Sequence, residues 1–563
     1  MADQTRPNIV YIMADQMSAP LLKIYNEHSV IKTPNLNRLA AEGVVFESAY
    51  CNSPLCAPSR FTMVTGQLPS KIGGYDNAAD LPSDIPTYAH YLRKEGYHTA
   101  LSGKMHFCGA DQLHGFEERL TSDIYPGDYG WSVNWDEPEI RLDYYHNMAS
   151  VIDAGPVART NQLDYDDEVV YKARQYLFDH VRFRNGQPFS LTISMTHPHD
   201  PYNMTKDYWD LYEDVDIPLP TTAAIDHEQQ DPHSKRILKC IDLWGKEMTE
   251  ADILKARRAY FSSCTYVDTK IGEIMNVLKE TGLDENTIVV FSGDHGDMLG
   301  ERGLWYKMSW FEPSARVPMF VYAPGRYQPQ RIKENVSTMD LLPTFVDMIG
   351  SRLDPGLPMD GVSLMPYISG AQGLKTDTVL GEYMGEGTQA PLVMIRRGPW
   401  KFVYSPIDPP QLYNLDNDPL EHINLAAGYA ATLPSRAEVL KNDPSTFING
   451  LPPTPPNGPT FSFNPSALVF PGEDQDAKKD LPSIINAFLQ EAAARWDFDA
   501  ITKNVLESQR RRRLVYSGLI KGVITPWDYT PPADGSKQFV RNQGKGILDD
   551  VEFLSRWPRV QRT

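Results

Sequence analysis

Cysteine is scarce in this sequence. Five cysteines occur among 563 residues: Cys51, Cys56, Cys108, Cys240 and Cys264. So few cysteines, and an odd number of them, argue against a disulfide framework and favour a reducing compartment. Long apolar runs are also missing, and the N-terminal stretch MADQTRPNIV has neither the basic nor the apolar part of a secretory signal. We therefore expect a cytoplasmic protein that does not span a membrane.

Basic charge is the second deficit. The chain has 54 lysines and arginines against 73 aspartates and glutamates, which gives a formal net charge of −19. A general nucleic-acid binder needs an electropositive surface, so the balance argues against that class. Any anionic ligand must instead be attracted by a local cluster. The strongest basic run, Arg510 to Arg513, we interpret as a solvated helix face.

Strand and helix patterns alternate through the first two thirds of the chain. A continuous apolar run, NIVYIMA (8–14), is typical of a strand buried on both faces of a parallel sheet. Similar strand patterns follow at 98–103, 189–195, 286–293 and 316–325. Helical patterns lie between them. This alternation predicts an α/β fold for residues 1–374, with a large mixed, mostly parallel sheet flanked by helices.

The pattern changes near residue 375. Segments such as TVLGEYM and PLVMIRRGPWKFVYS alternate apolar and polar residues between turn signals, which predicts an antiparallel sheet. We therefore expect a smaller C-terminal subdomain over residues 375–563. Within it, residues 426–482 are rich in proline, asparagine and glycine and are interpreted as an inserted loop. A helical pattern and an extended C-terminal tail follow.

Polar side chains come directly after the predicted strands. In chain order these residues are Asp15 and Gln16; Lys104 and His106; His197, His199 and Asp200; and Asp294, His295 and Asp297. Ligands of open α/β sheets bind beyond the carboxyl ends of the strands, so these side chains are expected to meet in one site. Taken alone, Asp15 is as consistent with a turn cap, and His197 is expected to be structural.

The stretch CNSPLCAPSRF places one cysteine, Cys56, where a helical pattern begins. Pro58 stands where a helix tolerates proline. The free N–H groups of a helix N-terminus attract anions, and Arg60 adds a fork of donors for an oxyanion. The element thus fits sulfate or phosphate, although a buried cysteine in a proline-containing turn is the alternative.

The motif Cys-x-Pro-Ser-Arg at positions 56–60 resembles that of the type I sulfatases, within the alkaline phosphatase superfamily. The longer context, from LCAPSR through KMHFCGADQLHGFEERLTSDIYP to the tail segment VITPWDYTPP, resembles the choline sulfatases in particular. The resemblance implies that Cys56 is oxidised to formylglycine (3-oxoalanine) by a formylglycine-generating enzyme. The hydrated aldehyde would then attack sulfur, and its second hydroxyl would let the sulfated intermediate collapse.

By the same resemblance, one divalent metal ion is implied. The positions that match the family's metal ligands are Asp15, Gln16, Cys56, Asp294 and His295. Oxygen-rich sites of this kind suit Ca²⁺ or Mn²⁺ better than zinc. Gln16 departs from the second aspartate that many sulfatases carry, and the lost negative charge leaves both metals open.

The resemblance also assigns roles around the sulfate. Arg60, Lys104 and Lys307 match the basic residues that would neutralise its oxygens. His106 matches the histidine near formylglycine, a candidate base. His199 matches the residue near the leaving-group oxygen, and we expect it to protonate that oxygen together with Lys307.

A choline group would need a different kind of pocket. Quaternary ammonium cannot donate hydrogen bonds, so aromatic faces and carboxylates must recognise it. The positions that match the choline sulfatase pocket are Trp131, His146, Asn147, Glu386 and, in the tail, Asp528. A tryptophan is also often a core residue, which is the alternative for Trp131.

Together these features predict an enzyme that hydrolyses choline-O-sulfate to choline and sulfate. An arylsulfatase or phosphonate monoester hydrolase of the same superfamily is one alternative. A non-catalytic protein that keeps Cys56 unconverted and binds a sulfated or choline-bearing ligand is another. By analogy with the family we expect a homodimer or homotetramer.

Overall fold

The computed structural model describes residues 6–184, 186–370, 377–429, 433, 434, 436, 439 and 481–522. The pocket residue expected in the tail, Asp528, lies outside the described residues, and so do most of the expected insertion (426–482) and the tail after residue 522.

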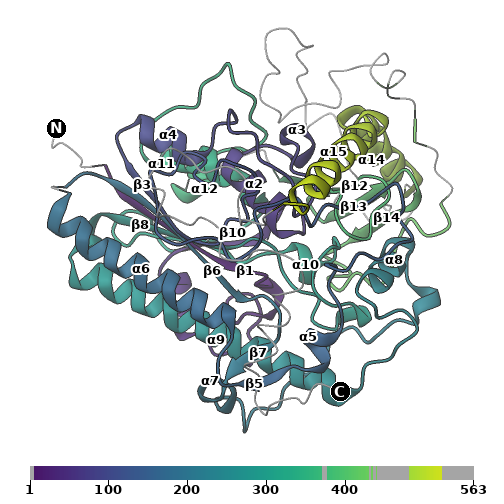
Figure 1. Ribbon diagram of the computed structural model, residues 1–563, viewed down its shortest axis with the longest axis horizontal. Helices are drawn as coiled ribbons and strands as arrows, with labels where there is room; N and C mark the ends of the chain where they lie inside the picture. Colours follow the sequence, from purple (N-terminus) through teal and green to yellow (C-terminus); the bar gives the residue numbers. More distant parts are fainter. Residues whose placement is uncertain are drawn as a thin grey trace.

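An eight-stranded sheet forms the centre of the molecule (Figure 1). Its strands, in spatial order, are β10 (Gln330–Ser337), β2 (Val44–Tyr50), β9 (Met319–Tyr322), β8 (Thr287–Gly293), β1 (Asn8–Asp15), β6 (Phe189–Pro198), β3 (His98–Gly103) and β4 (Glu118–Arg119). All neighbours are parallel except β9, which runs antiparallel to both β2 and β8. The predicted large, mostly parallel sheet is thereby confirmed, whereas β2, β4 and β10 were not predicted.

Two layers of helices bury the sheet. The long helices α6 (Asn161–Phe183) and α9 (Glu250–Glu280) lie side by side on one face (Figure 1). The other face is covered by α2 (Cys56–Thr65), α4 (Tyr88–Lys94) and α11 (Leu341–Met348). Because both faces are covered, every residue of β1 is buried, which explains its uninterrupted apolar sequence. None of the helices described here combines the length and apolar character that a membrane span requires.

Shorter elements complete this part of the chain. The remaining helices are α1 (Pro34–Ala41), α3 (Pro69–Ile72), α5 (Ala149–Ile152), α7 (Lys206–Asp210), α8 (Pro232–Cys240), α10 (Glu312–Ala315) and α12 (Met365–Ile368). Strands β5 (Gly155–Val157) and β7 (Asn203–Thr205) pair in parallel as a separate ribbon.

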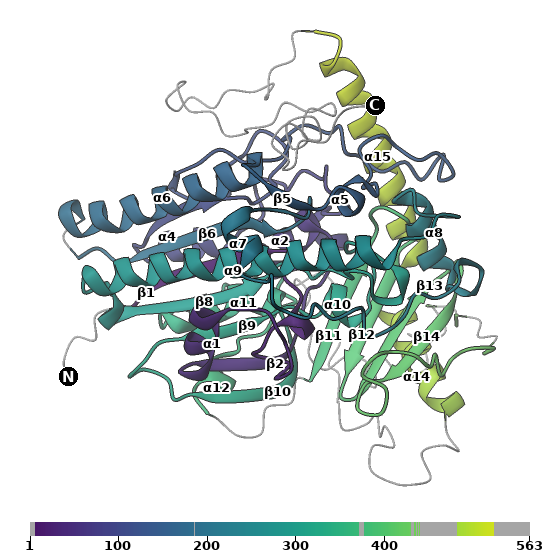
Figure 2. The ribbon, with the colours of Figure 1, turned by 90° about the horizontal axis from the view of Figure 1, so that it is seen from below.

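A second, antiparallel sheet lies beside the first (Figure 2). Its strands are β11 (Thr378–Tyr383), β12 (Leu392–Arg397), β13 (Trp400–Ser405) and β14 (Asp408–Asn414). Helix α14 (Leu481–Arg495) packs on it, with the rings of Phe402 and Phe488 stacked 5.2 Å apart. The next helix, α15 (Phe498–Leu519), begins after Asp497, whose carboxylate accepts a hydrogen bond from the Ala500 N–H.

The basic run on α15 is only partly the solvated face that we predicted. The side chain of Arg511 is 71% exposed and pairs only with Glu507 one turn away. Arg512 is different, because its guanidinium is buried against the carboxylate of Asp76. The interpretation is therefore wrong for Arg512: α15 crosses residues that lie more than 400 positions earlier, a contact that local pattern cannot reveal.

Candidate active site

The polar residues that follow the strands meet at one edge of the large sheet. Asp15 ends β1, Asp294 and His295 follow β8, and Cys56 is the first residue of α2. Ligand atoms of these four residues all lie within 4.8 Å of one another, and all four are buried. The Sγ atom of Cys56 lies 3.2 Å from Nε2 of His295. The sequence argument about strand ends thus identified a real cluster.

Two cations bridge the carboxylates of this cluster. The guanidinium of Arg60 contacts Oδ2 of Asp294 at 2.9 Å and Oδ2 of Asp15 at 3.2 Å. The ammonium of Lys104 pairs with the same oxygen of Asp15. Burial would raise the pKa of Asp15, as would Cys56, but the charges of Lys104, His199 and Arg60 outweigh this and lower it to about 2. Arg60 is thus turned toward the carboxylates, on the side away from the cavity described below.

The donor set fits a divalent cation. Two carboxylates and an imidazole converge in a buried space, and hard oxygen ligands are those that Ca²⁺ and Mn²⁺ prefer. The fifth expected ligand, Gln16, has a backbone φ of 64°. Its amide nitrogen donates to Asp297 at 2.7 Å, and its amide oxygen accepts from Lys307 at 2.7 Å. Gln16 therefore lies next to the cluster, and the charged side chains of Asp297 and Lys307 hold its amide group.

Cys56 has an unusual electrostatic environment. Burial raises the pKa of its thiol, but Lys104, Lys307, His295 and His106 together lower it well below the ordinary value. The expected free N–H groups of the helix start are partly used: the Ala57 N–H donates to Oδ1 of Asn77 at 3.0 Å. Positive side chains rather than backbone donors therefore dominate the space around Cys56.

Lys307 connects the cluster to the neighbouring histidines. Its ammonium lies 2.7 Å from Oε1 of Gln16, 2.7 Å from Nε2 of His199 and 3.1 Å from Nε2 of His146. An ammonium has three protons to donate, so Nε2 of His199 accepts and His199 carries its own proton on Nδ1. Nδ1 of His199 then donates to the backbone oxygen of Asp200 at 2.6 Å, in agreement with this tautomer.

Two carboxylates flank the histidines. Oδ1 of Asp200 lies 3.6 Å from Nε2 of His146, and Oε2 of Glu386 lies 3.5 Å from its Nδ1. Burial and Lys307 lower the pKa of His146, but these two carboxylates outweigh them and raise it to about 9. Glu386 is only 3% exposed. The carboxylate of Glu386 thus lies buried beside His146, in the same cavity as Cys56.

A cavity of about 840 Å³ opens from Cys56 past these groups. Its inner wall is aromatic: Trp131 stacks on Tyr144 with ring centroids 6.3 Å apart and lies 5.2 Å from Tyr125. Of the expected residues, the cavity is lined by Cys56, Trp131, His146, Asn147, His199 and Glu386. Carboxylate, aromatic faces and the reactive sulfur therefore share one space.

The other expected residues lie just behind this wall. The ring of His106 packs 5.2 Å from Tyr125 and 5.5 Å from Trp131. The ammonium of Lys104 stands 4.1 Å from the centre of the Tyr125 ring. His197, which we expected to be structural, is buried with its Nδ1 2.7 Å from Asp166. Asn147 uses its side-chain oxygen to cap Ala149 at 2.9 Å, so only part of its amide faces the cavity.

Sequence reasoning assigned no role to three further residues of the site. Asp200 contacts both histidines, Tyr125 forms a wall, and Asp297 holds Gln16. Asp200 in THPHDPY and Asp297 in DHGD stand among the polar residues that follow the predicted strands, so the sequence placed them correctly. Tyr125 belongs to the aromatic segment DIYPGDYGWSVNW, but its place in the wall depends on the path of a long loop.

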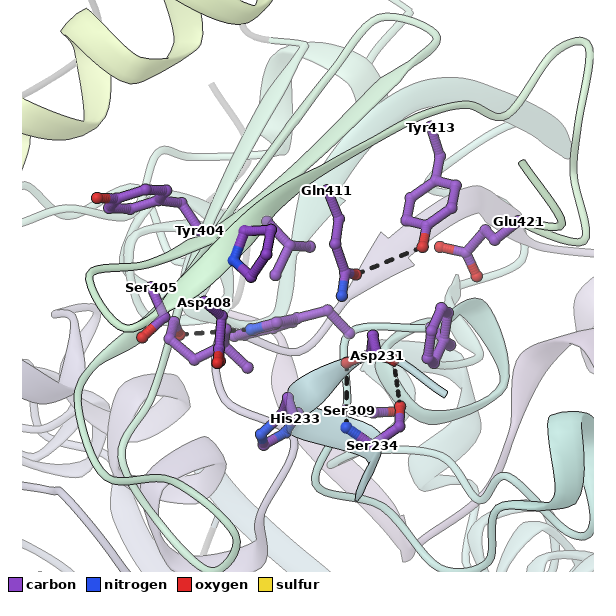
Figure 3. A pocket seen from close by; sticks show the side chains of 15 residues that line it. Asp231, His233, Ser234, Ser309, Tyr404, Ser405, Asp408, Gln411, Tyr413 and Glu421 are labelled. Atoms are coloured by element: carbon purple, nitrogen blue, oxygen red, sulfur yellow. Dashed lines mark hydrogen bonds between the residues drawn. The ribbon is translucent and has the colours of Figure 1, made fainter. Parts of the chain in front are cut away.

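A second cavity lies between α8 and the antiparallel sheet (Figure 3). Its volume is about 20 Å³, room for about one water molecule. In Figure 3, Ser234 and Asp231 bond to each other at its edge, and Gln411 bonds to Tyr413. None of the expected site residues lines it. Among the described residues, the expected site residues that line a cavity therefore do so at the larger one.

Comparison with protein families gives three matches. The model described as sulfatase matches residues 7–351. The model described as choline sulfatase enzyme C terminal matches residues 503–557. The model described as N-sulphoglucosamine sulphohydrolase, C-terminal, matches residues 300–436. These ranges include every expected site residue.

Comparison with curated proteins gives relatives that match three quarters or more of the chain. The chain is 43% identical to a choline-sulfatase of Rhizobium meliloti (strain 1021), over 98% of this chain and 99% of that protein. It is 31% identical to an arylsulfatase of Clostridium perfringens (strain 13 / Type A), over 75% of this chain and 90% of that protein.

Solved structures share the fold. A phosphonate monoester hydrolase of Agrobacterium radiobacter superposes with a TM-score of 0.61 at 23% identity, covering 75% of this chain and 92% of that one. A phosphonate monoester hydrolase from Silicibacter pomeroyi gives a TM-score of 0.61 at 24% identity, covering 76% and 92%.

Proposed function

The chain belongs to the sulfatase family, and on that premise we propose that it hydrolyses choline-O-sulfate to choline and sulfate. One observation carries the choice of substrate. The cavity that begins at Cys56 ends at an aromatic wall and a buried carboxylate, Glu386, which is the chemistry that recognises a quaternary ammonium group. The 43% identity to a choline-sulfatase over nearly the whole chain supports the same substrate.

Membership of the family implies that Cys56 is converted to formylglycine, the hydrate of which supplies the nucleophilic hydroxyl. The position of Cys56 suits this role, because the first residue of a helix is fixed in direction and its neighbours Lys104 and Lys307 stabilise a negatively charged nucleophile. We infer that a formylglycine-generating enzyme is the partner required for maturation.

The family also implies a divalent metal ion, and we propose Ca²⁺ or Mn²⁺. Asp15, Asp294, His295 and converted Cys56 would hold it, with Gln16 as the fifth ligand. When bound, such an ion polarises the nucleophile and a sulfate oxygen. Arg60 and Lys104 hold the two aspartates in their orientation, whichever of the two metals is present.

The remaining residues act on the sulfate and the leaving oxygen. Lys104 and Lys307 neutralise the sulfate oxygens, and His106 stands beside Cys56 to take a proton when the intermediate breaks down. Choline leaves as a strongly basic alkoxide, so it must gain a proton as the S–O bond breaks. Lys307, whose ammonium lies 2.7 Å from Nε2 of His199, passes a proton to Nε2, and the Nε2–H of His199 gives that proton to the leaving oxygen.

At the other end of the substrate, the trimethylammonium group would lie against Trp131 and near Glu386. His146 and Asn147 form the adjacent wall. In keeping with the family and the small number of cysteines, we propose that the protein acts in the cytoplasm as a homodimer or homotetramer, with Asp528 of the tail contributing to the choline pocket.

Steady-state hydrolysis tests the proposal directly. Protein co-expressed with a formylglycine-generating enzyme is assayed on choline-O-sulfate, an aryl sulfate and a phosphonate monoester. We expect the highest kcat/KM for choline-O-sulfate. A preference for either other ester would refute the substrate while leaving the nucleophile in place. No turnover of all three, with an intact Cys56 thiol found by peptide mass spectrometry, would favour a binding protein.

Substitution of the pocket sharpens this test. Trp131→Ala and Glu386→Ala should lower kcat/KM for choline-O-sulfate by about 100-fold but for an aryl sulfate by only a few-fold, because the ammonium contacts are absent from the aryl ester. Trp244→Ala, which removes a tryptophan outside the cavity, is the matched control. Equal losses on both substrates would contradict the assignment of the pocket.

A further inference from the structure

Helix α15 is attached to the loop that carries Trp131. The backbone N–H of Trp135 donates to Oε1 of Gln509 at 2.9 Å. Arg510 and Arg513 both pair with the carboxylate of Asp136, at 2.6 and 2.7 Å. The helix also lines the cavity itself with Arg513 and Tyr516. A helix near the end of the chain therefore forms part of the wall of the active site.

Arg512 makes the most buried of these contacts. Its Nη1 lies 2.5 Å from Oδ1 of Asp76 and its Nη2 lies 2.9 Å from Oδ2, a two-bond fork. The same Nη1 donates to Oγ of Ser132 at 3.1 Å. The Arg512 side chain is 8% exposed, and that of Asp76 is 1% exposed. One guanidinium on α15 thus contacts two segments, at Asp76 and at Ser132, that are far from it in the sequence.

The contacts of Asp76 continue toward Trp131. Its Oδ2 also accepts a hydrogen bond from the Val133 N–H at 3.4 Å. The two residues that follow Trp131 are therefore held by the Arg512–Asp76 pair, one through its side chain and one through its backbone. Displacement of this pair would move the indole that faces the cavity.

Stability alone is a poor explanation for the pair. Two charges lose their hydration when they are buried, and a well-packed apolar pair is often as stable. An ion pair does, however, impose direction, because the planar fork of arginine matches a carboxylate in one orientation. Because the pair holds the two residues that follow Trp131, this fixed orientation can define the position of the indole.

We propose that Arg512 is a positioning residue that fixes the Trp131 loop for recognition of the substrate's ammonium group. The step from loop position to substrate selection rests on the proposed function. Asp76 is the less suitable residue to change, since its neighbour Asn77 binds the Ala57 N–H beside Cys56. Arg512 contacts the loop itself through the side chain of Ser132.

The experiment compares the converted, metal-loaded wild-type enzyme with Arg512→Met, Arg512→Lys and the control Arg511→Met. Arg511 is the adjacent arginine on the same helix, 71% exposed, with only a surface partner. For Arg512→Met we expect KM for choline-O-sulfate to rise by about tenfold, the scale of a small misplacement of a binding group. We expect kcat/KM for an aryl sulfate to stay within about twofold of wild type. Lysine keeps the charge without the fork, so Arg512→Lys should lie between.

Hydrogen exchange of the backbone amides supplies a readout that does not need the substrate. We expect residues 131–135 to exchange at least about tenfold faster in Arg512→Met and to be unchanged in Arg511→Met, because only the first substitution frees the loop. Faster exchange across the whole protein would indicate general destabilisation and would overturn the positioning role. Unchanged exchange of the loop would overturn it as well.

The two readouts separate the inference from the function on which it rests. A loosened loop with unchanged KM, in an enzyme that does hydrolyse choline-O-sulfate, would overturn the link to substrate selection. If the wild-type enzyme prefers another ester, the proposed function fails. The exchange result then still decides whether Arg512 positions this loop.

Discussion

Lys307 and Lys401 are both completely buried, yet they have opposite kinds of partners. The ammonium of Lys401, on β13, contacts the carboxylates of Glu312 at 2.6 Å and Glu421 at 2.8 Å and the Trp310 oxygen at 2.9 Å. The ammonium of Lys307 contacts an amide oxygen and two imidazoles, and none of these three partners is a carboxylate. Both side chains have an exposed fraction of 0%.

The difference separates structural charge from functional charge. Two carboxylates cancel the charge of Lys401, so this cluster has nothing left to offer a ligand. Partners other than carboxylates satisfy the hydrogen bonds of Lys307 and leave its positive charge available to an anion. Burial lowers the pKa of Lys307, but Cys56, Asp200, Asp15 and Glu386 outweigh burial and raise it, so the side chain stays protonated. Exposure and residue type alone would not distinguish the two lysines.

Removal of the reactive atom gives the largest expected effect. Cys56→Ala should lower turnover by at least about 10⁴-fold, because no other group in the site can form the covalent intermediate. The Lys401 cluster is untouched, so the melting temperature should stay close to that of the wild-type enzyme. Assay of sulfate release together with a thermal melt checks both. Residual activity near the wild-type level would remove Cys56 from the mechanism.

Disruption of the cluster formed by Lys401, Glu312 and Glu421 should affect stability instead. Lys401→Met removes the ammonium that Glu312 and Glu421 share and leaves Glu312 only its longer pair with Arg316 at 3.7 Å, at a cost of about 3–5 kcal/mol in the free energy of unfolding. The kcat of the molecules that remain folded should be unchanged. Denaturant unfolding and active-site titration give the two quantities. The triple variant with Glu312→Gln and Glu421→Gln should recover much of the loss, since it removes the unpaired charges.

Replacement of Lys307 by methionine should affect activity more than stability. Lys307→Met is expected to lower kcat/KM by about 10²–10³-fold, the usual effect of losing one charge that stabilises a transition state. Its melting temperature should fall much less than that of Lys401→Met, because the Lys307 ammonium has no direct contact with a carboxylate to lose. A variant that unfolds readily and keeps its activity would erase the distinction between the two lysines.

A third buried cluster tests the comparison by pH. Burial raises the pKa of Glu491, but Arg397 and Arg495 outweigh it and lower that pKa from 4.5 to about 2. A lowered carboxyl pKa stabilises the fold above the ordinary value of 4.5, and this contribution of about 3 kcal/mol is lost as the pH falls from there to about 2. Unfolding of Glu491→Gln should therefore depend less steeply on pH between 5 and 2. Activity at neutral pH should not change.

The fold and the core of the site could be predicted from the sequence to different extents. The apolar run of β1 and the residues after β1, β6 and β8 were sufficient to predict a parallel sheet with a polar cluster at its edge. The antiparallel direction of β9 could not be predicted, because a buried strand has the same composition in either direction. Strands β2 and β10 were missed because their burial patterns are mixed.

By itself, the sequence determined which residues carry chemistry and that they stand at strand ends and at a helix start, because those are local properties of the chain. Only the tertiary structure decided their roles. It turned Arg60 toward two aspartates, placed an amide and two imidazoles around Lys307, and buried Arg512 against Asp76. It also holds Tyr306 and Met308, on either side of Lys307, at positive φ values of 64° and 73°. Charge, hydrogen bonding and strain at these positions depend on groups tens to hundreds of residues away, which no local pattern contains.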